Sequence, residues 1–195
     1  MQLLFVTGNK NKVREVERVL GFSVEQIEID LPEIQAINVQ TVIEAKAKSA
    51  YHQVGRAILV EDTGLSINAW NGMPGALITW FLKSVGNEGI CRMLEGFEDR
   101  QATAETWIGF YDGKHIESFF GITNGTIAES PRGTKGFGWD SLFIPDGFNK
   151  TFAELTEDEK AHISMRTEAV LKLKAYLGKQ NLLLHKTLLG KSTGF

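Results

Sequence analysis

The sequence has almost no cysteine and no long apolar run. Its one cysteine among 195 residues, Cys91, excludes an internal disulfide and is typical of a reducing compartment. No stretch reaches the roughly 18 consecutive apolar residues that a membrane-spanning helix needs. The first residues, MQLLFVTG, lack the flanking charge of a signal peptide. We therefore expect a cytoplasmic protein without a membrane partner, in which Cys91 is a small apolar helix residue rather than a nucleophile.

The sequence also lacks a basic surplus. Its net charge is −3, whereas affinity for a nucleic-acid backbone needs an excess of lysine and arginine, so no nucleic-acid partner is expected. An anionic ligand would have to be met by a few local cations. The motifs H-E-x-x-H and C-x-x-C are absent as well, and G-x-S-x-G occurs only as GKSTG at residues 190–194, which does not stand between an expected strand and an expected helix as a nucleophile elbow would. Zinc hydrolysis and a serine nucleophile are therefore without support.

The composition, 43% hydrophobic and 23% charged, is that of an ordinary globular chain, and we expect one domain over residues 1–195. Residue patterns predict an α/β fold with a mixed sheet, including a hairpin that turns at Asp112-Gly113. The expected strands are Leu3–Thr7, Val24–Asp30, Ala57–Val60, Ala102–Tyr111, His115–Ile122 and Leu142–Ile144. The expected helices are Lys10–Leu20, Val42–Val54, Ala76–Leu94 with a break near Gly86, and Asp158–Leu177.

The stretch FVTGNKNKVREV, residues 5–16, places a short polar loop between a strand and a helix. The amides at the start of such a helix, with the helix dipole behind them, favour an anion. Lys12 adds a charge within the first turn, and Asn9 is a candidate to bind a phosphate or ribose oxygen. The loop has neither the P-loop pattern nor the dinucleotide fingerprint. Taken alone, it indicates either a plain strand–helix turn or a phosphate site.

Two acidic motifs follow predicted strands. IDLPE, residues 29–33, and LVEDTGL, residues 59–65, place Glu33, Glu61 and Asp62 at strand ends. Strand ends gather at the edge of a sheet where open α/β folds bind ligands. Two carboxylates and substrate phosphates are a common set of ligands for Mg²⁺. The alternative interpretation is that these residues form turns or helix caps.

Further candidates lie on helices and in one glycine-rich loop. Lys46 is on the flank of an apolar helix stripe, where it either reaches a cleft or stays solvated. RGTKGFGWD, residues 132–140, offers aromatic faces and free backbone, so it either holds a planar heterocycle or caps the core. EDEKAHISMRTEAV, residues 157–170, adds Lys160 and Arg166, which suit phosphate and carbonyl oxygens. His162 is expected to be an ordinary surface residue.

Together these motifs resemble the inosine triphosphate pyrophosphatase family, enzymes of non-canonical purine nucleoside triphosphates. The resemblance runs from Leu4 to about Tyr176 and rests on TGNKNK, IDLPE, VEDTGL, FGWD, EK and MR, with PGALITWFL, GFEDR, PRG and PDGF…TFAEL between them. It implies a long mixed twisted sheet with flanking helices, two lobes around a nucleotide-binding cleft, and a homodimer. It also implies Mg²⁺-dependent cleavage of ITP, dITP and XTP to the monophosphate and pyrophosphate.

The resemblance also implies a role for each motif. Thr7, Gly8, Asn9, Lys10, Asn11 and Lys12 would hold the triphosphate, with Lys12 as the main charge. Glu33 and Asp62 would bind the metal, and Asp62 would be the base for the attacking water. Thr63, Lys46 and Lys160 would complete the substrate contacts. The base would be held by Phe137, Gly138, Trp139 and Asp140, with the Phe137 ring stacking on it, and Arg166 would read its 6-oxo group.

The sequence departs from the family pattern at two positions. Met165 stands where the family usually has histidine, and Ser141 stands where proline usually follows the aspartate. Methionine cannot donate a hydrogen bond, so the base-reading contact of that histidine is expected to be missing. Hydrolysis with relaxed or altered base selectivity is therefore an alternative to the family activity. A nucleotide sensor without turnover is a further alternative, although the retained Asp62 speaks against it.

Overall fold

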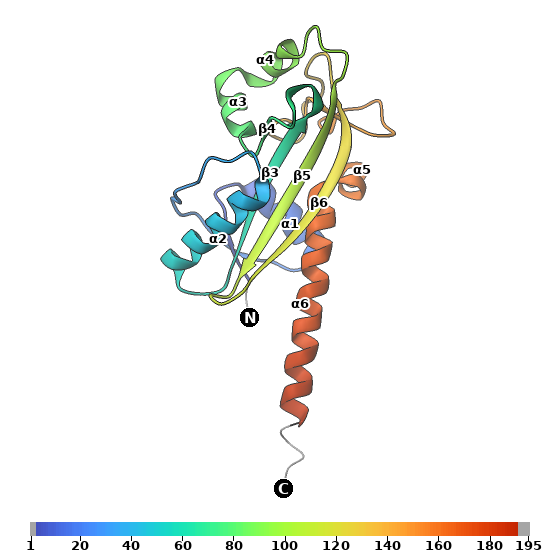
Figure 1. Ribbon diagram of the computed structural model, residues 1–195. Helices are drawn as coiled ribbons and strands as arrows, with labels where there is room; N and C mark the ends of the chain where they lie inside the picture. Colours follow the sequence, from blue (N-terminus) through green and yellow to red (C-terminus); the bar gives the residue numbers. More distant parts are fainter. Residues whose placement is uncertain (1–2, 191–195) are drawn as a thin grey trace.

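The computed structural model describes residues 3–190, and describes only the backbone over residues 181–190 (Figure 1). It begins with a parallel strand pair, β1 (Leu4–Val6) and β2 (Glu25–Ile27), joined by helix α1 (Lys10–Leu20). Asn9 caps the start of α1, and Gly21 ends it in the left-handed conformation with φ of 80°. The predicted strand–helix–strand unit is therefore confirmed, including both ends of the helix.

The sheet continues in the order β2-β1-β3-β5-β6-β7. Strand β3 (Ile58–Ile67) is parallel to β1, whereas β5 (Gln101–Tyr111), β6 (Ile116–Ile127) and β7 (Phe143–Pro145) follow in antiparallel pairs. The short β4 (Pro74–Gly75) pairs with the far end of β3. The mixed sheet is confirmed. The hairpin at Asp112 is confirmed too, and the Asp112 carboxylate accepts hydrogen bonds from the amides of Lys114 and His115.

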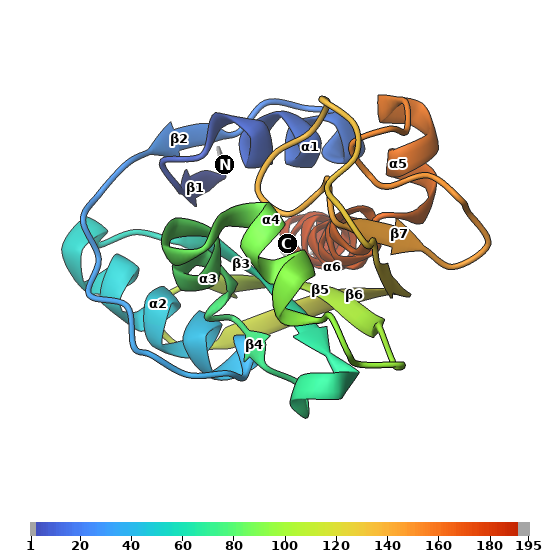
Figure 2. The same ribbon diagram turned by 90° about the horizontal axis from the view of Figure 1, so that it is seen from above.

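Helices cover both faces of the lower part of this sheet (Figures 1 and 2). Helix α2 (Val39–Val54) packs on one face in a core that includes Ile43, Ile58 and Val60. Helices α1 and α6 (Met165–Gly190) pack on the other face in a core that includes Leu59 and Leu173. Because side chains alternate along a strand, β3 sends even-numbered residues towards α2 and odd-numbered residues towards α1 and α6.

A third core forms a separate upper lobe. Helices α3 (Ile78–Ser84) and α4 (Gly86–Met93) lie there, with the 3₁₀ turn η1 (Asn68–Trp70) and helix α5 (Glu157–Ile163) nearby. The predicted break at Gly86 is confirmed, and Cys91 is buried in α4. Strands β3, β5 and β6 run through both lobes, and the upper core includes Leu65, Ile67, Ala104 and Ile127 from them. The predicted two-lobed arrangement therefore follows from three long strands with different cores at their two ends.

Several predicted element bounds were wrong. Strand β3 was expected to end at Val60, but it pairs with β5 as far as Ile67, so Glu61 and Asp62 lie within the strand and not after it. The helix expected over Asp158–Leu177 is two helices, because Ser164 between them is extended with ψ of 131°. Other ends moved by a few residues: α2 begins at Val39 behind the cap Asn38, β2 is shorter, and β6 is longer than expected.

Two further expectations concern a membrane-spanning helix and the C-terminal segment. Among residues 3–190, no helix combines the length and apolar content of a membrane span. The apolar stripe in LLLHKTLLGKSTGF, residues 182–195, was expected to pack on the surface or, as the minority option, to form a dimer contact. Its side chains lie outside the described residues, and that prediction stays a prediction.

Candidate active site

The polar loop after β1 is organised by its own side chains. The Asn9 Oδ1 accepts hydrogen bonds from the amides of Asn11 and Lys12 at 2.9 and 3.4 Å, and the Thr7 hydroxyl accepts one from the Asn9 amide. Asn9 is therefore a helix cap through its oxygen, while its Nδ2, the group that can donate to a phosphate oxygen, makes no hydrogen bond among the described residues. Among the described residues, the amides of Gly8 and Lys10 have no partner. These two amides are the ones left for an anion at the start of α1.

The edge of β3 next to this loop is bare. Strand β1 pairs with β3 only at Ile58 and Leu59, and β4 pairs only at Leu65 and Ser66. Within the described residues, no strand pairs with residues 61–64 on this edge, although β5 pairs with all four on the other. The central sheet therefore has a gap at Glu61, Asp62, Thr63 and Gly64, beside the loop after β1.

On the α1 and α6 face of this gap, Glu61 is surrounded by cations. Its Oε1 accepts from Arg166 Nη2 at 3.2 Å and from the Thr63 hydroxyl at 2.6 Å, while Lys12 Nζ lies 3.2 Å from its Oε2. Burial alone would raise the pKa of Glu61, but Arg166 and Lys12 outweigh it and lower the pKa to about 2. Glu61 is therefore ionised and fixes Lys12 and Arg166 beside the gap.

A second carboxylate, Glu15 of α1, links Arg166 to Lys160. Arg166 Nη1 donates to Glu15 Oε2, and Lys160 Nζ lies 3.2 Å from Glu15 Oε1. Burial would raise the pKa of Glu15, but these two cations lower it. Burial opposes the charge on Arg166 too, yet Glu61 and Glu15 raise its pKa. We did not select Glu15 or Glu61 as substrate residues from the sequence. Glu15 lies one turn after Lys12 on the same face of α1, which was the available signal.

On the opposite face of β3, Asp62 lies near Lys46 of α2. Burial raises the pKa of Asp62, and the charges of Lys12 and Lys46 offset only part of that effect. Lys46 Nζ is 2.5 Å from Glu33 Oε1, and the carboxylates of Asp62 and Glu33 raise the Lys46 pKa against the effect of burial. Of the two positions that the sequence left open for Lys46, the structure shows the inward one, because its side chain is only 15% exposed.

A pocket of ≈ 420 Å³ opens where these groups meet the upper lobe. Its lining includes Thr7 and Gly8 from the loop after β1, together with Glu33 and Lys46. Trp80 of α3 closes one side, and its indole N–H donates to Gln35 Oε1 at 2.5 Å. This hydrogen bond joins the upper lobe to the segment that carries Glu33. Lys10, by contrast, is exposed and lines neither pocket described here.

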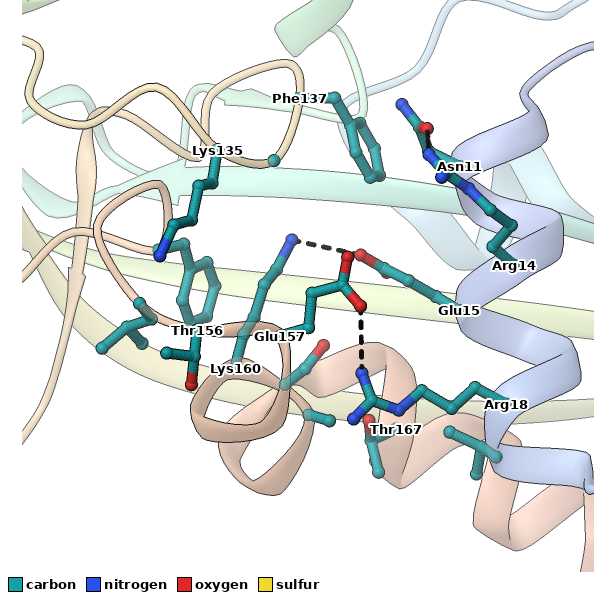
Figure 3. A pocket seen from close by; sticks show the side chains of 16 residues that line it. Asn11, Arg14, Glu15, Arg18, Lys135, Phe137, Thr156, Glu157, Lys160 and Thr167 are labelled. Carbon is teal, nitrogen blue, oxygen red and sulfur yellow. Dashed lines mark hydrogen bonds and ion pairs between the residues drawn. The ribbon is translucent and has the colours of Figure 1, made fainter.

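A second pocket, of ≈ 260 Å³, lies between α1 and the loop before α5 (Figure 3). The lining residues include Asn11, Glu15, Phe137, Lys160 and Ser164. Figure 3 shows Phe137 and Lys160 facing the side chains of α1 across this space. The Lys160 ammonium is 5.1 Å from the centre of the Phe137 ring, and the Arg166 guanidinium is 5.6 Å from it. One aromatic face therefore lies next to the two cations of the final motif.

The FGWD loop is held mainly by Asp140. Its Oδ2 accepts from the Phe137 amide at 2.9 Å and from Lys160 Nζ at 2.7 Å, so Asp140 braces the loop, one of the roles the sequence suggested. The Trp139 ring is 7% exposed and packs on Phe143 and Phe152. The sequence left open whether this ring faces a ligand or caps the core, and the structure shows that it belongs to the core. Only its backbone remains available.

Met165, at the start of α6, also points into the upper core. Its side chain is 2% exposed, and the hydroxyls of Thr123 and Ser164 lie 3.9 Å from its sulfur. It lines neither pocket. The position therefore supplies no strong hydrogen-bond donor near Phe137, as the sequence indicated. His162 is exposed on α5, where its ring contacts the carbonyl of Asp158.

Comparison with known proteins identifies the family to which this chain belongs. A family model described as the Ham1 family matches residues 3–176. The chain belongs to the Ham1 family. Curated relatives include the inosine triphosphate pyrophosphatase of Kluyveromyces lactis, 44% identical over 186 residues, which cover 90% of this chain and 95% of that protein. Another is the dITP/XTP pyrophosphatase of Methanopyrus kandleri, 41% identical over 174 residues, 87% of this chain and 93% of that protein.

Solved structures of Ham1-family proteins have the same fold. A HAM1 protein from Coxiella burnetii superposes with a TM-score of 0.80 at 27% identity, covering 92% of this chain and all of that one. A nucleoside-triphosphatase, also named dITP/XTP pyrophosphatase, from Mycobacterium abscessus gives a TM-score of 0.71 at 29% identity, covering 89% and 98%. The fold of this chain is therefore that of these solved structures.

Proposed function

We propose that this chain hydrolyses deaminated purine nucleoside triphosphates, such as ITP, dITP and XTP, to the monophosphate and pyrophosphate. The observation that carries the proposal is one chain of ion pairs, which links the two pockets through Lys12, Glu61, Arg166, Glu15 and Lys160. The site has lysines and a helix N-terminus at one end, a buried carboxylate in the middle, and an aromatic loop at the other. The activities named for the Kluyveromyces and Methanopyrus relatives support the same reaction.

The cationic end suits the triphosphate. Lys12 and the free amides of Gly8 and Lys10 are at the start of α1, and Lys46 lines the adjoining pocket. Phosphoryl transfer depends mainly on positioning and on neutralising charge, which these groups provide. In our proposal Thr7 to Lys12 and Lys46 hold the phosphates, and Thr63 adds a hydroxyl beside them.

Asp62 is proposed as the base that activates water. The water oxygen bonds to the α-phosphorus, the bond to the β-phosphate oxygen breaks, and Asp62 takes the water proton while pyrophosphate leaves. A general base needs a pKa nearer to neutrality than an ordinary aspartate has, and burial moves Asp62 in that direction. Its Oδ1 already accepts from the Thr63 amide at 2.8 Å, which fixes the orientation of the carboxylate.

Glu33 and Asp62 are the proposed ligands of Mg²⁺. Within residues 3–190, no cluster of three His, Cys, Asp or Glu side chains forms a cage for a metal ion. Two carboxylates nevertheless fit Mg²⁺, because this ion keeps several waters and takes further oxygens from substrate phosphates. Glu33 lines the pocket beside the bare edge of β3 that carries Asp62. When bound, the ion neutralises phosphate charge.

The aromatic end suits a purine. In our proposal the base stacks on Phe137, the backbone of Gly138, Trp139 and Asp140 lies along its edge, and Arg166 donates to its 6-oxo group. Both terminal nitrogens of Arg166 are already paired, but its buried Nε has no partner among the described residues. Adenine has an amino group, itself a donor, in place of the 6-oxo group. The Arg166 donor that faces it would be left unpaired, and this disfavours ATP.

The deciding experiment is a product assay with Mg²⁺ and five substrates: ITP, XTP, dITP, ATP and GTP. We expect pyrophosphate as the primary product, with kcat/KM for ITP at least tenfold above that for ATP. Orthophosphate as the primary product would contradict the site of cleavage. Binding of ITP without turnover would instead favour a nucleotide sensor.

A second candidate is the same hydrolysis with relaxed base selectivity. It is favoured by Met165, whose buried side chain offers no strong donor near the base loop. Equal kcat/KM values for ITP and ATP in the same assay would favour this candidate.

We also propose a homodimer in the cytoplasm. The dimer rests on the family resemblance, and light scattering of the purified chain, which measures molar mass in solution, tests it. The location rests on the single cysteine, and fractionation of the source cells tests it.

A further inference from the structure

The base loop, defined here as residues 136–141, has a second anchor that its own sequence does not reveal. Asn87 is the second residue of α4, in the upper lobe. Its Nδ2 donates to the Gly138 carbonyl at 3.1 Å and to the Ser141 hydroxyl at 2.9 Å. Both hydrogens of one amide group are thus used on the loop that carries Phe137.

This anchor lies on the opposite side of the loop from the Asp140 brace. Asp140 and Lys160 hold the loop from the α5 side, through the Phe137 amide. Asn87 holds it from the α4 side, at the residues directly after Phe137 and Asp140. Gly136 and Gly138 have φ of 74° and 63°, in a region that glycine enters freely, so the loop backbone is not fixed by its own sterics. Hydrogen bonds, within the loop and from the elements around it, must therefore select its conformation.

The orientation of the Asn87 amide is fixed by its partners. A carbonyl such as that of Gly138 only accepts, so the nitrogen of Asn87 must face it. The Asn87 oxygen is then buried without a hydrogen-bond partner among the described residues. An unpaired buried acceptor is unfavourable, so the two donated bonds have to outweigh that cost.

We propose that Asn87 is a positioning residue for the base. Acting through Gly138 and Ser141, it keeps the Phe137 ring in the orientation that a purine needs for stacking. The inference builds on the proposed nucleotide function and adds a residue outside every motif that identified the site. It also gives Ser141 a role, because this hydroxyl accepts the second bond where the family pattern suggested proline. Proline restrains the backbone covalently, whereas here a hydrogen-bond contact from helix α4 to the loop does so.

The test separates the base end of the site from the phosphate end. Asn87→Ala removes both hydrogen bonds, and Ser141→Ala removes one. Steady-state kinetics with ITP give KM and kcat, and inorganic tripolyphosphate, which has no base, serves as a competitive inhibitor. We expect Asn87→Ala to raise KM for ITP about three- to tenfold with kcat within twofold, and Ser141→Ala to raise KM about two- to threefold. The inhibition constant of tripolyphosphate should not change in either variant.

Asn149→Ala is the matched control. Asn149 is exposed, and in the described residues only its carbonyl is hydrogen-bonded, to Arg132. Ser141→Pro adds a second control, because no hydrogen bond of the described residues uses the Ser141 amide. In the Ser141→Pro background the proline restrains the loop, so Asn87→Ala should raise KM by a smaller factor than it does in the wild type. Thermal melting of each variant checks that it is folded.

Two outcomes would overturn the inference. One is an unchanged KM for ITP in Asn87→Ala. The other is a parallel rise in KM and in the tripolyphosphate inhibition constant, which would indicate a general structural effect.

If the wild type releases no pyrophosphate from any substrate, the proposed function fails, and calorimetric binding of IMP and pyrophosphate replaces the kinetics. Weaker binding of IMP by Asn87→Ala with unchanged binding of pyrophosphate would support the inference even then. Unchanged binding of IMP would overturn it.

Discussion

Arg166 and Glu61 form a buried ion pair, with Nη2 3.2 Å from Oε1, at the centre of the site. Lys12 completes the group at 3.2 Å from the other carboxylate oxygen. One cation belongs to the end of the site assigned to phosphate and the other to the end assigned to the base. A single carboxylate of β3 therefore fixes the distance between the two ends.

Replacing Glu61 should destabilise the fold. Glu61→Gln leaves Arg166 and Lys12 without their shared carboxylate, and we expect the free energy of unfolding at pH 7 to fall by about 3 kcal/mol. Because folding lowers the pKa of Glu61 from 4.5 to about 2, its contribution is complete above pH 4.5 and is lost as the pH falls towards 2. Urea unfolding of wild type and variant at several pH values measures this. The difference in unfolding free energy between wild type and Glu61→Gln should disappear as the pH falls towards 2.

Glu98→Gln is the control for that experiment, since Glu98 is exposed in the loop between α4 and β5 and lines neither pocket. Its unfolding free energy should stay within about 0.5 kcal/mol of the wild type. A Glu61→Gln protein as stable as the wild type at pH 7 would show that the ion pair contributes nothing net.

Replacing Asp62 should remove catalysis and spare binding. Asp62→Asn keeps the size of the side chain but cannot take a proton from water, so we expect kcat to fall at least about a hundredfold. Calorimetry with ITP should still give binding. Asp146→Asn, an exposed change of the same kind, should keep full activity. An active Asp62→Asn enzyme would exclude this residue as the base.

The pH profile of the wild type should reflect the environment of Asp62. A base works in its ionised form, and burial raises the pKa of Asp62 above its ordinary 3.8. We therefore expect kcat/KM to rise with pH through an apparent pKa above that value, and to fall about tenfold per pH unit below it. A profile that stays flat in this acid range would contradict the assignment. Unfolding must be followed in parallel to separate it from titration.

The hydrogen bond between Trp80 and Gln35 should support the metal end of the site. Trp80→Phe keeps an aromatic ring beside the pocket but removes the indole N–H that Gln35 accepts at 2.5 Å. Because Gln35 is two residues from Glu33, we expect about a threefold rise in the Mg²⁺ concentration needed for half-maximal activity. Trp70→Phe, also in the upper lobe and packed on Phe81, is the control. Equal Mg²⁺ dependence in wild type and Trp80→Phe would mean the contact is incidental.

Position 165 should influence base selectivity. Met165→Leu replaces one buried apolar side chain by another, and the ratio of kcat/KM for ITP to that for ATP should stay within twofold. Met165→His introduces an imidazole, which needs a partner when buried. In the proposed complex the keto oxygen of the base lies in the pocket lined by the neighbouring Ser164, and an imidazole turned out of the core towards it gains that partner, so we expect the ratio to rise several-fold. If histidine leaves the ratio unchanged, selectivity is determined elsewhere in the site.

Local patterns predicted the local structure well. The helix Lys10–Leu20 has its cap at Asn9 and its glycine stop at Gly21, and both are encoded within a few residues. The hairpin at Asp112 is equally local. Strand β3 was predicted too short because Glu61-Asp62-Thr63 has no apolar alternation, and only pairing with β5 makes it a strand. The break at Ser164 was missed because the apolar pattern continues across it.

The candidate site, too, was predicted in part from local sequence and decided in part by the fold. The types of residue at the loop after β1, at Glu33, Asp62 and Lys46, and in the FGWD stretch indicated a nucleotide and Mg²⁺ from sequence alone. Which groups meet was decided by the fold. Glu61 and Asp62 are neighbours in sequence, but strand alternation sends them to opposite faces, towards Arg166 and towards Lys46. Glu15 and Asn87 acquire partners 151 and 54 residues away, which no local pattern can reveal.

The sequence by itself determined the chemistry that the chain carries, since charge, caps and turn residues act over a few positions. The tertiary structure decided which of those groups are buried, and hence how they behave. Trp139 and Met165 became core residues because the upper lobe packs its hydrophobic side chains there. Glu61 became strongly acidic because the fold placed two cations beside it, whose charges outweigh the opposite effect of burial on its pKa.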